Sequence, residues 1–148
     1  MTPAGNTLQA RPVMAIDVGT TRIGLAVSDP TRTIATPVAT VARNSPDVWR
    51  LMTEHVQEHD AALAVVGLPR LLDGSEGDAA ADARSFAAEF QQKIGVTVEL
   101  WDERFTTALA ERSLIEAGMR RQRRKATVDA VAATLILQSW LDAHNKRS

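Results

Sequence analysis

The sequence predicts an α/β fold built on a mixed five-stranded sheet with helices on both faces. Three observations carry this prediction: short apolar runs rich in β-branched residues, longer segments with apolar residues at helical spacing, and the order in which the two alternate. Three strands come first, followed by helix, strand, helix, strand and helix. With right-handed crossovers, the fourth and fifth strands lie beyond the first, so the expected strand order is 3-2-1-4-5.

The strands are expected where apolar runs are bounded by turn residues. The first two form a hairpin around the polar residues 19–22, and the third pairs with them as a meander. The five expected strands cover residues 13–18, 23–27, 33–41, 62–66 and 96–101.

Helix boundaries are expected at capping residues. Ser45, with Pro46 at the first helical position, is expected to open the first helix, and Gly95 to end the second. The second helix is expected over residues 78–94, the third from Thr106 or Thr107 to near Gly118, and the last helix after a cap at Thr127.

Length and composition indicate one domain that is compatible with a reducing cytoplasm. The chain has 148 residues, a net charge of −1 and no cysteine, so disulfides and thiolate metal sites are excluded. No apolar run approaches the ~20 residues of a membrane helix, and we expect no membrane association. Residues 1–11 lack the features of a signal peptide and are expected to form a flexible tail, with residues 12–148 as a single domain.

Asp17 is the one charged residue inside the first apolar run. A carboxylate buried in a sheet needs a metal, a cation or a set of donors to compensate its lost hydration. The alternative is structural: Asp17 ends its strand early and accepts a hydrogen bond from the amide of Thr20 or Thr21.

Further acids occur at the ends of later elements. Asp102 and Glu103 follow the fifth strand, and Asp129 begins the last helix. Clustered carboxylates without cysteine or histidine favour Mg²⁺ or Mn²⁺, and two such ions support phosphodiester hydrolysis. Each acid has a structural alternative: Asp129 suits a first helical turn, and Asp102, Glu103 and Arg104 could form a solvated cluster.

A basic segment precedes the last helix, at residues 120–125. Its charge is typical of nucleic-acid contacts, although it could also be a solvated loop. The cations expected to contact nucleic acid are Arg22, Arg104, Arg123, Arg124 and Lys125.

Four motifs occur in order: Asp17-Val-Gly-Thr-Thr-Arg-Ile-Gly-Leu-Ala-Val-Ser-Asp29, Val66-Gly-Leu-Pro69 with Asp73-Gly74, Asp102-Glu-Arg-Phe-Thr-Thr107, and Lys125 with Val128-Asp129-Ala130. Together they closely resemble the YqgF/RuvX family over residues 12–141. The resemblance implies a ribonuclease H-like fold and a bacterial cytoplasmic nuclease that matures the end of pre-16S rRNA, with Holliday-junction resolution as a related activity.

By the same resemblance, the catalytic and metal-binding acids are Asp17, Glu103 and Asp129. Asp102 remains the alternative to Glu103, because strand alternation places these two neighbours on opposite faces. One departure is Leu71, where many relatives carry asparagine, and it puts a substrate contact there in doubt.

Two functions of other classes compete with the nuclease. One is a non-catalytic RNA-binding module. The other is an ATP-binding actin-like domain, although such proteins close the nucleotide between two domains and this chain has room for one. Monomer and homodimer both remain open, and a junction resolvase favours the dimer.

His55 and His59 have the i, i+4 spacing of a zinc pair. They lack an HExxH pattern and an obvious third ligand, so we expect only a solvated helix end.

Overall fold

The computed structural model describes residues 11–106 and 128–145. The elements are β1 (Val13–Val18), β2 (Arg22–Ser28), β3 (Ala35–Ala42), α2 (Val48–Glu58), β4 (Leu63–Leu68), α3 (Asp78–Ile94), β5 (Thr97–Asp102), the 3₁₀ turn η1 (Glu103–Phe105) and α6 (Val128–Asn145). The expected third helix after residue 106, its alternative cap Thr107, the Thr127 cap and the N-terminal tail up to residue 10 lie outside the described residues. Thr106, the other expected cap, is described as the C-cap of η1.

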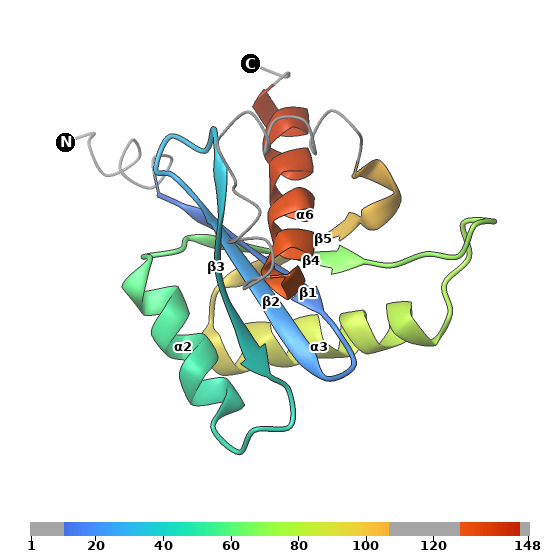
Figure 1. Cartoon of the computed structure of the whole chain (residues 1–148), viewed down its shortest axis with the longest axis horizontal. Coiled ribbons are helices and arrows are strands. Elements are labelled where there is room, and N and C mark those ends of the chain that lie inside the picture. Colours follow the sequence, from blue (N-terminus) through green and yellow to red (C-terminus); the bar gives the residue numbers. More distant parts are fainter. Residues whose placement is uncertain (1–10, 107–127, 146–148) are drawn as a thin grey trace.

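The five strands form one sheet in the order β3-β2-β1-β4-β5, which confirms the predicted order (Figure 1). β2 is antiparallel to both β1 and β3, whereas β1, β4 and β5 run parallel. The three parallel strands therefore end at the same edge of the sheet, which we call the carboxyl edge. β1 is central, so this edge is the place where an open α/β sheet puts its functional site.

Helices cover both faces of the sheet, as predicted (Figure 1). On one face, α2 and α3 pack on Met14, Ile16 and Val66 in a core that includes Phe90. On the other face, which we call the α6 face, the alternate strand residues pack beneath α6. None of the described helices is long and apolar enough to span a bilayer.

Helix boundaries agree with the sequence in one case and differ in another. α3 covers Asp78–Ile94 and ends at Gly95, whose φ of 86° is readily adopted only by glycine. The expected cap at Ser45 is wrong, because α2 begins at Val48. The Ser45 hydroxyl accepts from the Asp47 amide, and its carbonyl accepts from the Val48 amide, so Ser45 stabilises a turn before the helix.

Two strands extend further than predicted at the carboxyl edge. β4 continues through Gly67 to Leu68, and β5 includes Asp102. Gly67 pairs with Trp101 and Leu68 with Asp102, so the ladder reaches the residue before Glu103. Gly67 therefore lies inside the sheet, under α6, and not in a loop.

Candidate active site

Asp17 lies inside β1, where it pairs with Gly24 of β2. Strand alternation places it on the same face as Val13 and Ala15, which pack under α6. The alternative that Asp17 ends its strand early is wrong, because β1 continues beyond it. The strand therefore holds a half-buried carboxylate on the α6 face near the carboxyl edge.

Glu103 is the first residue of η1 and reaches back under α6. A Cβ atom placed on Gly67 would lie 2.8 Å from Glu103 Oε2 and 2.6 Å from Ile136 Cδ1 of α6. Any side chain at this strand position would displace the carboxyl group or the helix. Glycine inside a strand typically marks such a close approach, so Gly67 makes room for Glu103.

The Glu103 carboxyl group is unfavourably placed as an anion. Burial, then the charge of Asp17, and then that of Asp102 raise its pKa to about 7. Asp17 and Glu103 are therefore close enough to repel each other. A hard divalent cation at these oxygens would reverse the effect, and a donor set of carboxylates alone fits Mg²⁺ or Mn²⁺. The residues present thus suit the metal that the sequence implies.

Asp102 has the opposite environment. Its carboxylate accepts from Arg104 Nη2 at 2.8 Å and forms an ion pair with Arg70 Nε at 3.4 Å. It also caps η1 by accepting from the Arg104 amide at 2.9 Å. The hydrogen bond from the Arg104 side chain is the main factor that lowers the pKa of Asp102. Of the two neighbouring acids, the structure brings Glu103 to Asp17 and engages Asp102 with arginines.

The direction of α6 places its N-terminus toward the carboxyl edge. At the opposite end, Asn145 donates to the carbonyl of Arg32, whose side chain in turn donates to the carbonyl of Arg11, just before β1. Ile136, further back in the helix, lies against Gly67 near the end of β4. α6 therefore runs from the carboxyl edge toward the start of β1.

Asp129 belongs to the first turn of this helix, two turns before Ile136. Residues seven apart share a helix face, so Asp129 occupies the same face of α6 as Ile136, the face that packs on the sheet. Its side chain is outside the described part of the structure. The helix N-terminus adds partial positive charge, which favours anionic groups at this edge.

A tight turn follows Asp17 and is anchored at a distance. The Gly19 amide donates to the Arg22 carbonyl at 2.9 Å, and a Cβ on Gly19 would lie 2.6 Å from that oxygen. The Gly19 carbonyl accepts from Arg43 Nη1, and the Arg43 guanidinium donates through Nη1 and Nη2 to the Asp82 carboxylate of α3. Sequence reasoning missed Arg43, because its partners lie 24 and 39 residues away and leave no local signal.

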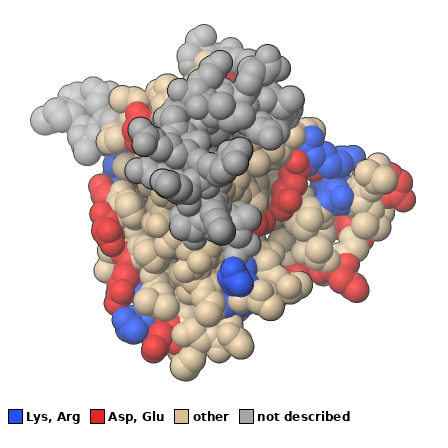
Figure 2. All heavy atoms as spheres, in the orientation of Figure 1, with Lys and Arg blue, Asp and Glu red and all other residues tan. Residues whose placement is uncertain are grey.

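Of the five predicted basic residues, the structure describes Arg22 and Arg104. Arg104 is neutralised by Asp102, and Arg22 is exposed at the start of β2 with an interaction of its own. Arg123, Arg124 and Lys125 lie outside the described residues. Figure 2 shows basic and acidic side chains side by side near the loop after β4.

Comparison with known proteins identifies the family of this chain. A family model described as RuvX, Holliday junction resolvase, matches residues 11–143. A relative from Myxococcus xanthus named "Putative pre-16S rRNA nuclease" is 49% identical, covering 88% of this chain and 87% of its own. A relative of the same name from Mycobacteroides abscessus is 45% identical, covering 90% and 82%.

Among solved structures, Thermus thermophilus RuvC in complex with a Holliday junction substrate has a TM-score of 0.63 at 16% identity. The match covers 93% of this chain and 98% of that one. A second Thermus thermophilus RuvC structure has a TM-score of 0.54. At this identity the likeness concerns the fold, and it confirms the expected ribonuclease H-like architecture.

Proposed function

This chain belongs to the RuvX family, and from that premise we propose that it is a divalent-metal-dependent nuclease acting on structured nucleic acid. The observation that carries the proposal is the placement of Glu103 beside Asp17 under α6, with Gly67 making room for it. The names of the relatives favour the end of pre-16S rRNA as the substrate. Such maturation belongs in the cytoplasm, the location expected for this protein.

We assign Asp17, Glu103 and Asp129 as the residues that hold Mg²⁺ or Mn²⁺. When bound, the metal would activate water and stabilise the leaving oxygen of the cleaved phosphodiester. The chain itself orients these acids: β1 fixes Asp17, η1 and Gly67 fix Glu103, and the first turn of α6 carries Asp129. Arg43 ties down the turn after Asp17.

Nucleic-acid contacts are assigned to the basic residues predicted from the sequence. Arg123, Arg124 and Lys125 precede α6 in sequence, and Arg22 begins β2. Phosphate contacts from such residues position a strand without reading its sequence. Arg104 contributes less, because Asp102 already offsets its charge.

A second candidate is resolution of branched DNA. The description of the family model favours it, as does the junction bound to the RuvC neighbour. Resolution requires two cuts, so it predicts a homodimer, whereas trimming of an RNA end is compatible with a monomer. A non-catalytic RNA-binding module would retain the acids for folding alone.

A cleavage assay separates these functions. Precursor 16S rRNA, a four-way DNA junction and single strands would each be incubated with the full-length protein and Mg²⁺ or Mn²⁺. We expect precursor rRNA to be cut at least about tenfold faster, equivalent to ~1.4 kcal/mol in the transition state. Preference for the junction would favour the resolvase. Binding without cleavage of any substrate would contradict the nuclease.

A further inference from the structure

Three potential metal ligands lie together at the end of α2. One ligand atom each from His55, Glu58 and His59 can be chosen so that all lie within 4.8 Å of one another. Spacings of three and four residues put the side chains on one face of the helix. No third ligand is obvious from the sequence pattern, and the structure identifies Glu58 as a candidate for it.

The cluster differs from the charged groups beside it. Glu54 pairs with Arg50 at 2.8 Å, and Asp60 pairs with Arg11 at 3.1 Å. Within residues 11–106 and 128–145, the side chains of the cluster make no such pair. His55 Nδ1 is buried and has no hydrogen-bond partner among these residues. A buried ring nitrogen without a partner is unusual and leaves a lone pair or a proton uncompensated.

We propose that His55, Glu58 and His59 form a binding site for Zn²⁺. Two imidazole nitrogens and one carboxylate oxygen are the donor set of zinc sites that keep an open fourth position. Zinc bonds of ~2.0–2.2 Å bring tetrahedral ligand atoms to within about 3.6 Å of one another, so the side chains need to close by little more than 1 Å. Glu58 is exposed and the histidines are half-buried, which permits that rotation.

This site is separate from the carboxyl edge. The segment after α2 returns to the start of the parallel strands, where the Ala62 amide donates to the Pro12 carbonyl at 2.9 Å. Strands of six residues separate that end from Glu103, roughly 15–20 Å at 3.3 Å per residue. Imidazole also suits zinc, whereas the carboxylates at the other edge suit Mg²⁺ or Mn²⁺. A zinc ion here would fix the end of α2 or receive a fourth ligand from a partner, and would not act in cleavage.

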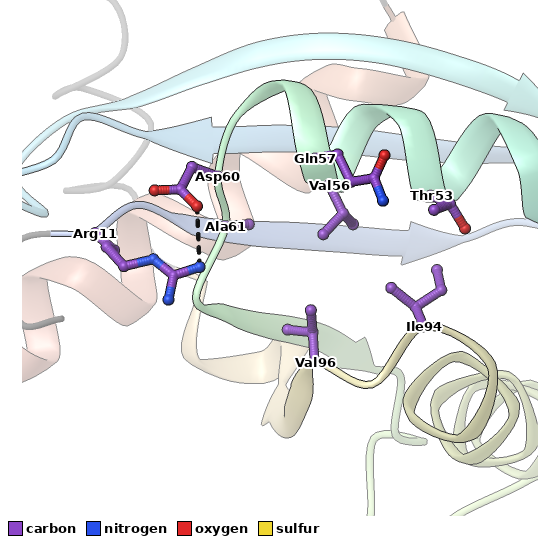
Figure 3. A pocket seen from close by; sticks show the side chains of 8 residues that line it. All are labelled: Arg11, Thr53, Val56, Gln57, Asp60, Ala61, Ile94 and Val96. Carbon is purple, nitrogen blue, oxygen red and sulfur yellow. Dashed lines mark hydrogen bonds and ion pairs between the residues drawn. The ribbon is translucent and has the colours of Figure 1, made fainter.

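A pocket near the same end of α2 is lined by residues other than those of the cluster, and Figure 3 shows these lining residues. Its helix residues are Thr53, Val56 and Gln57, which lie on a different stripe of α2, and Asp60 follows the helix. The Arg11–Asp60 ion pair borders it. The zinc site therefore does not depend on this pocket.

Isothermal titration calorimetry of ZnCl₂ into the full-length protein tests the proposal, with excess Mg²⁺ present to occupy the carboxyl edge. We expect one site with a dissociation constant of about 10 µM or tighter. His59→Ala and His55→Ala should each weaken zinc binding by at least about tenfold, and zinc should raise Tm in the wild type but not in these variants.

His144→Ala is the matched control. The His144 ring stacks on Trp140 and hydrogen-bonds to its carbonyl, so zinc binding should stay at the wild-type level. Asp17→Asn should also retain zinc binding, and a loss there would assign the ion to the carboxyl edge. Glu58→Gln, an exposed change that folding tolerates, should weaken binding as well. Binding equal to wild type in both histidine variants, or weaker than about 100 µM, would indicate an adventitious ion only and overturn the proposal.

Discussion

Asp102 and Glu103 are neighbours in sequence, yet they lie in opposite electrostatic environments on the two sides of the sheet. Arg104 and Arg70 surround Asp102 and hold its pKa below the usual range. Burial and nearby carboxylates raise the pKa of Glu103 to about 7. The two arginines thus neutralise Asp102, whereas Glu103 is unfavourable as an anion.

The difference teaches which acid serves the fold and which serves chemistry. A neutralised acid that caps a turn stabilises the chain. An acid packed beside another acid costs stability, and such groups persist where a cation or a reaction needs them. Asp82 is likewise neutralised by an arginine, Arg43, which also holds the turn after Asp17.

The largest expected effect comes from removing one member of the unfavourable pair. Asp17→Asn should lower cleavage by more than about 100-fold, since even outer partners of metal ligands cost roughly 10–100-fold. Nucleic-acid binding should remain. Asp60→Asn, which changes an ion-paired acid at the other edge, is the control in the same cleavage and binding assays. An equal loss of cleavage in Asp17→Asn and Asp60→Asn would contradict the distinction between acids that serve chemistry and ion-paired acids that serve the fold.

Gly67→Ala should have the next largest effect. Its methyl group would meet Ile136 Cδ1 and Glu103 Oε2, and overpacking of this kind costs about 1–3 kcal/mol. Cleavage and the urea midpoint should both fall. Ile136→Val in the same chain removes the clashing Cδ1 atom and should restore part of the stability.

Gly77→Ala is the matched control, because its new methyl group would meet the nearest atom, Leu71 Cδ1, at an ordinary 3.7 Å. It should leave activity near the wild-type level. If Gly67→Ala leaves cleavage as little changed as Gly77→Ala does, Glu103 does not approach β4 as closely as the structure indicates.

Glu103→Gln should change stability with pH. The ordinary pKa of 4.5 rises to about 7 on folding, so the folded state binds more protons between these values. The free energy of unfolding contributed by Glu103 is therefore fully present below about pH 4.5 and is lost as pH rises toward 7. Without metal, Glu103→Gln should be more stable than wild type by ~1–2 kcal/mol at about pH 8, after solvent screening, with little difference at about pH 4.

Urea unfolding in EDTA measures this difference, and added Mg²⁺ should reduce it by stabilising the wild type. A constant difference across the pH range would mean that Glu103 has an ordinary pKa.

The smallest expected effect belongs to Asp102→Asn. The variant weakens the cap of η1 and the pairs with Arg104 and Arg70, which are partly exposed. Unfolding should become easier by about 1 kcal/mol, and cleavage should stay within about tenfold of wild type. Thermal unfolding and the cleavage assay test this together, and a loss as large as that of Asp17→Asn would reverse the roles of the two acids.

Local patterns were sufficient to predict the order of the sheet and much of its detail. Apolar runs and the glycine stop at Gly95 are short-range signals, and strand alternation correctly put Asp102 and Glu103 on opposite faces. The predicted helix cap at Ser45 was wrong because its hydroxyl accepts a hydrogen bond within the turn before α2. Sequence preference alone does not distinguish a serine in a turn from a serine at a helix N-cap.

The rest depended on contacts between distant residues. Gly67 meets Glu103 and Ile136, 36 and 69 residues further along the chain. A glycine inside a strand could have indicated a close approach, but the sequence does not show which residues approach it. Glu58 could have been noticed three residues after His55, although only the structure shows that its oxygen lies within 4.8 Å of a nitrogen of each histidine.

The most direct measurement is a pH titration of the Glu103 carboxyl carbon by NMR, assigned with Glu103→Gln, without metal and with Mg²⁺. A midpoint near 7 without metal that falls by more than about one unit with Mg²⁺ is the predicted result. A midpoint near 4.5, unchanged by Mg²⁺, would contradict a metal-binding carboxylate beside Asp17.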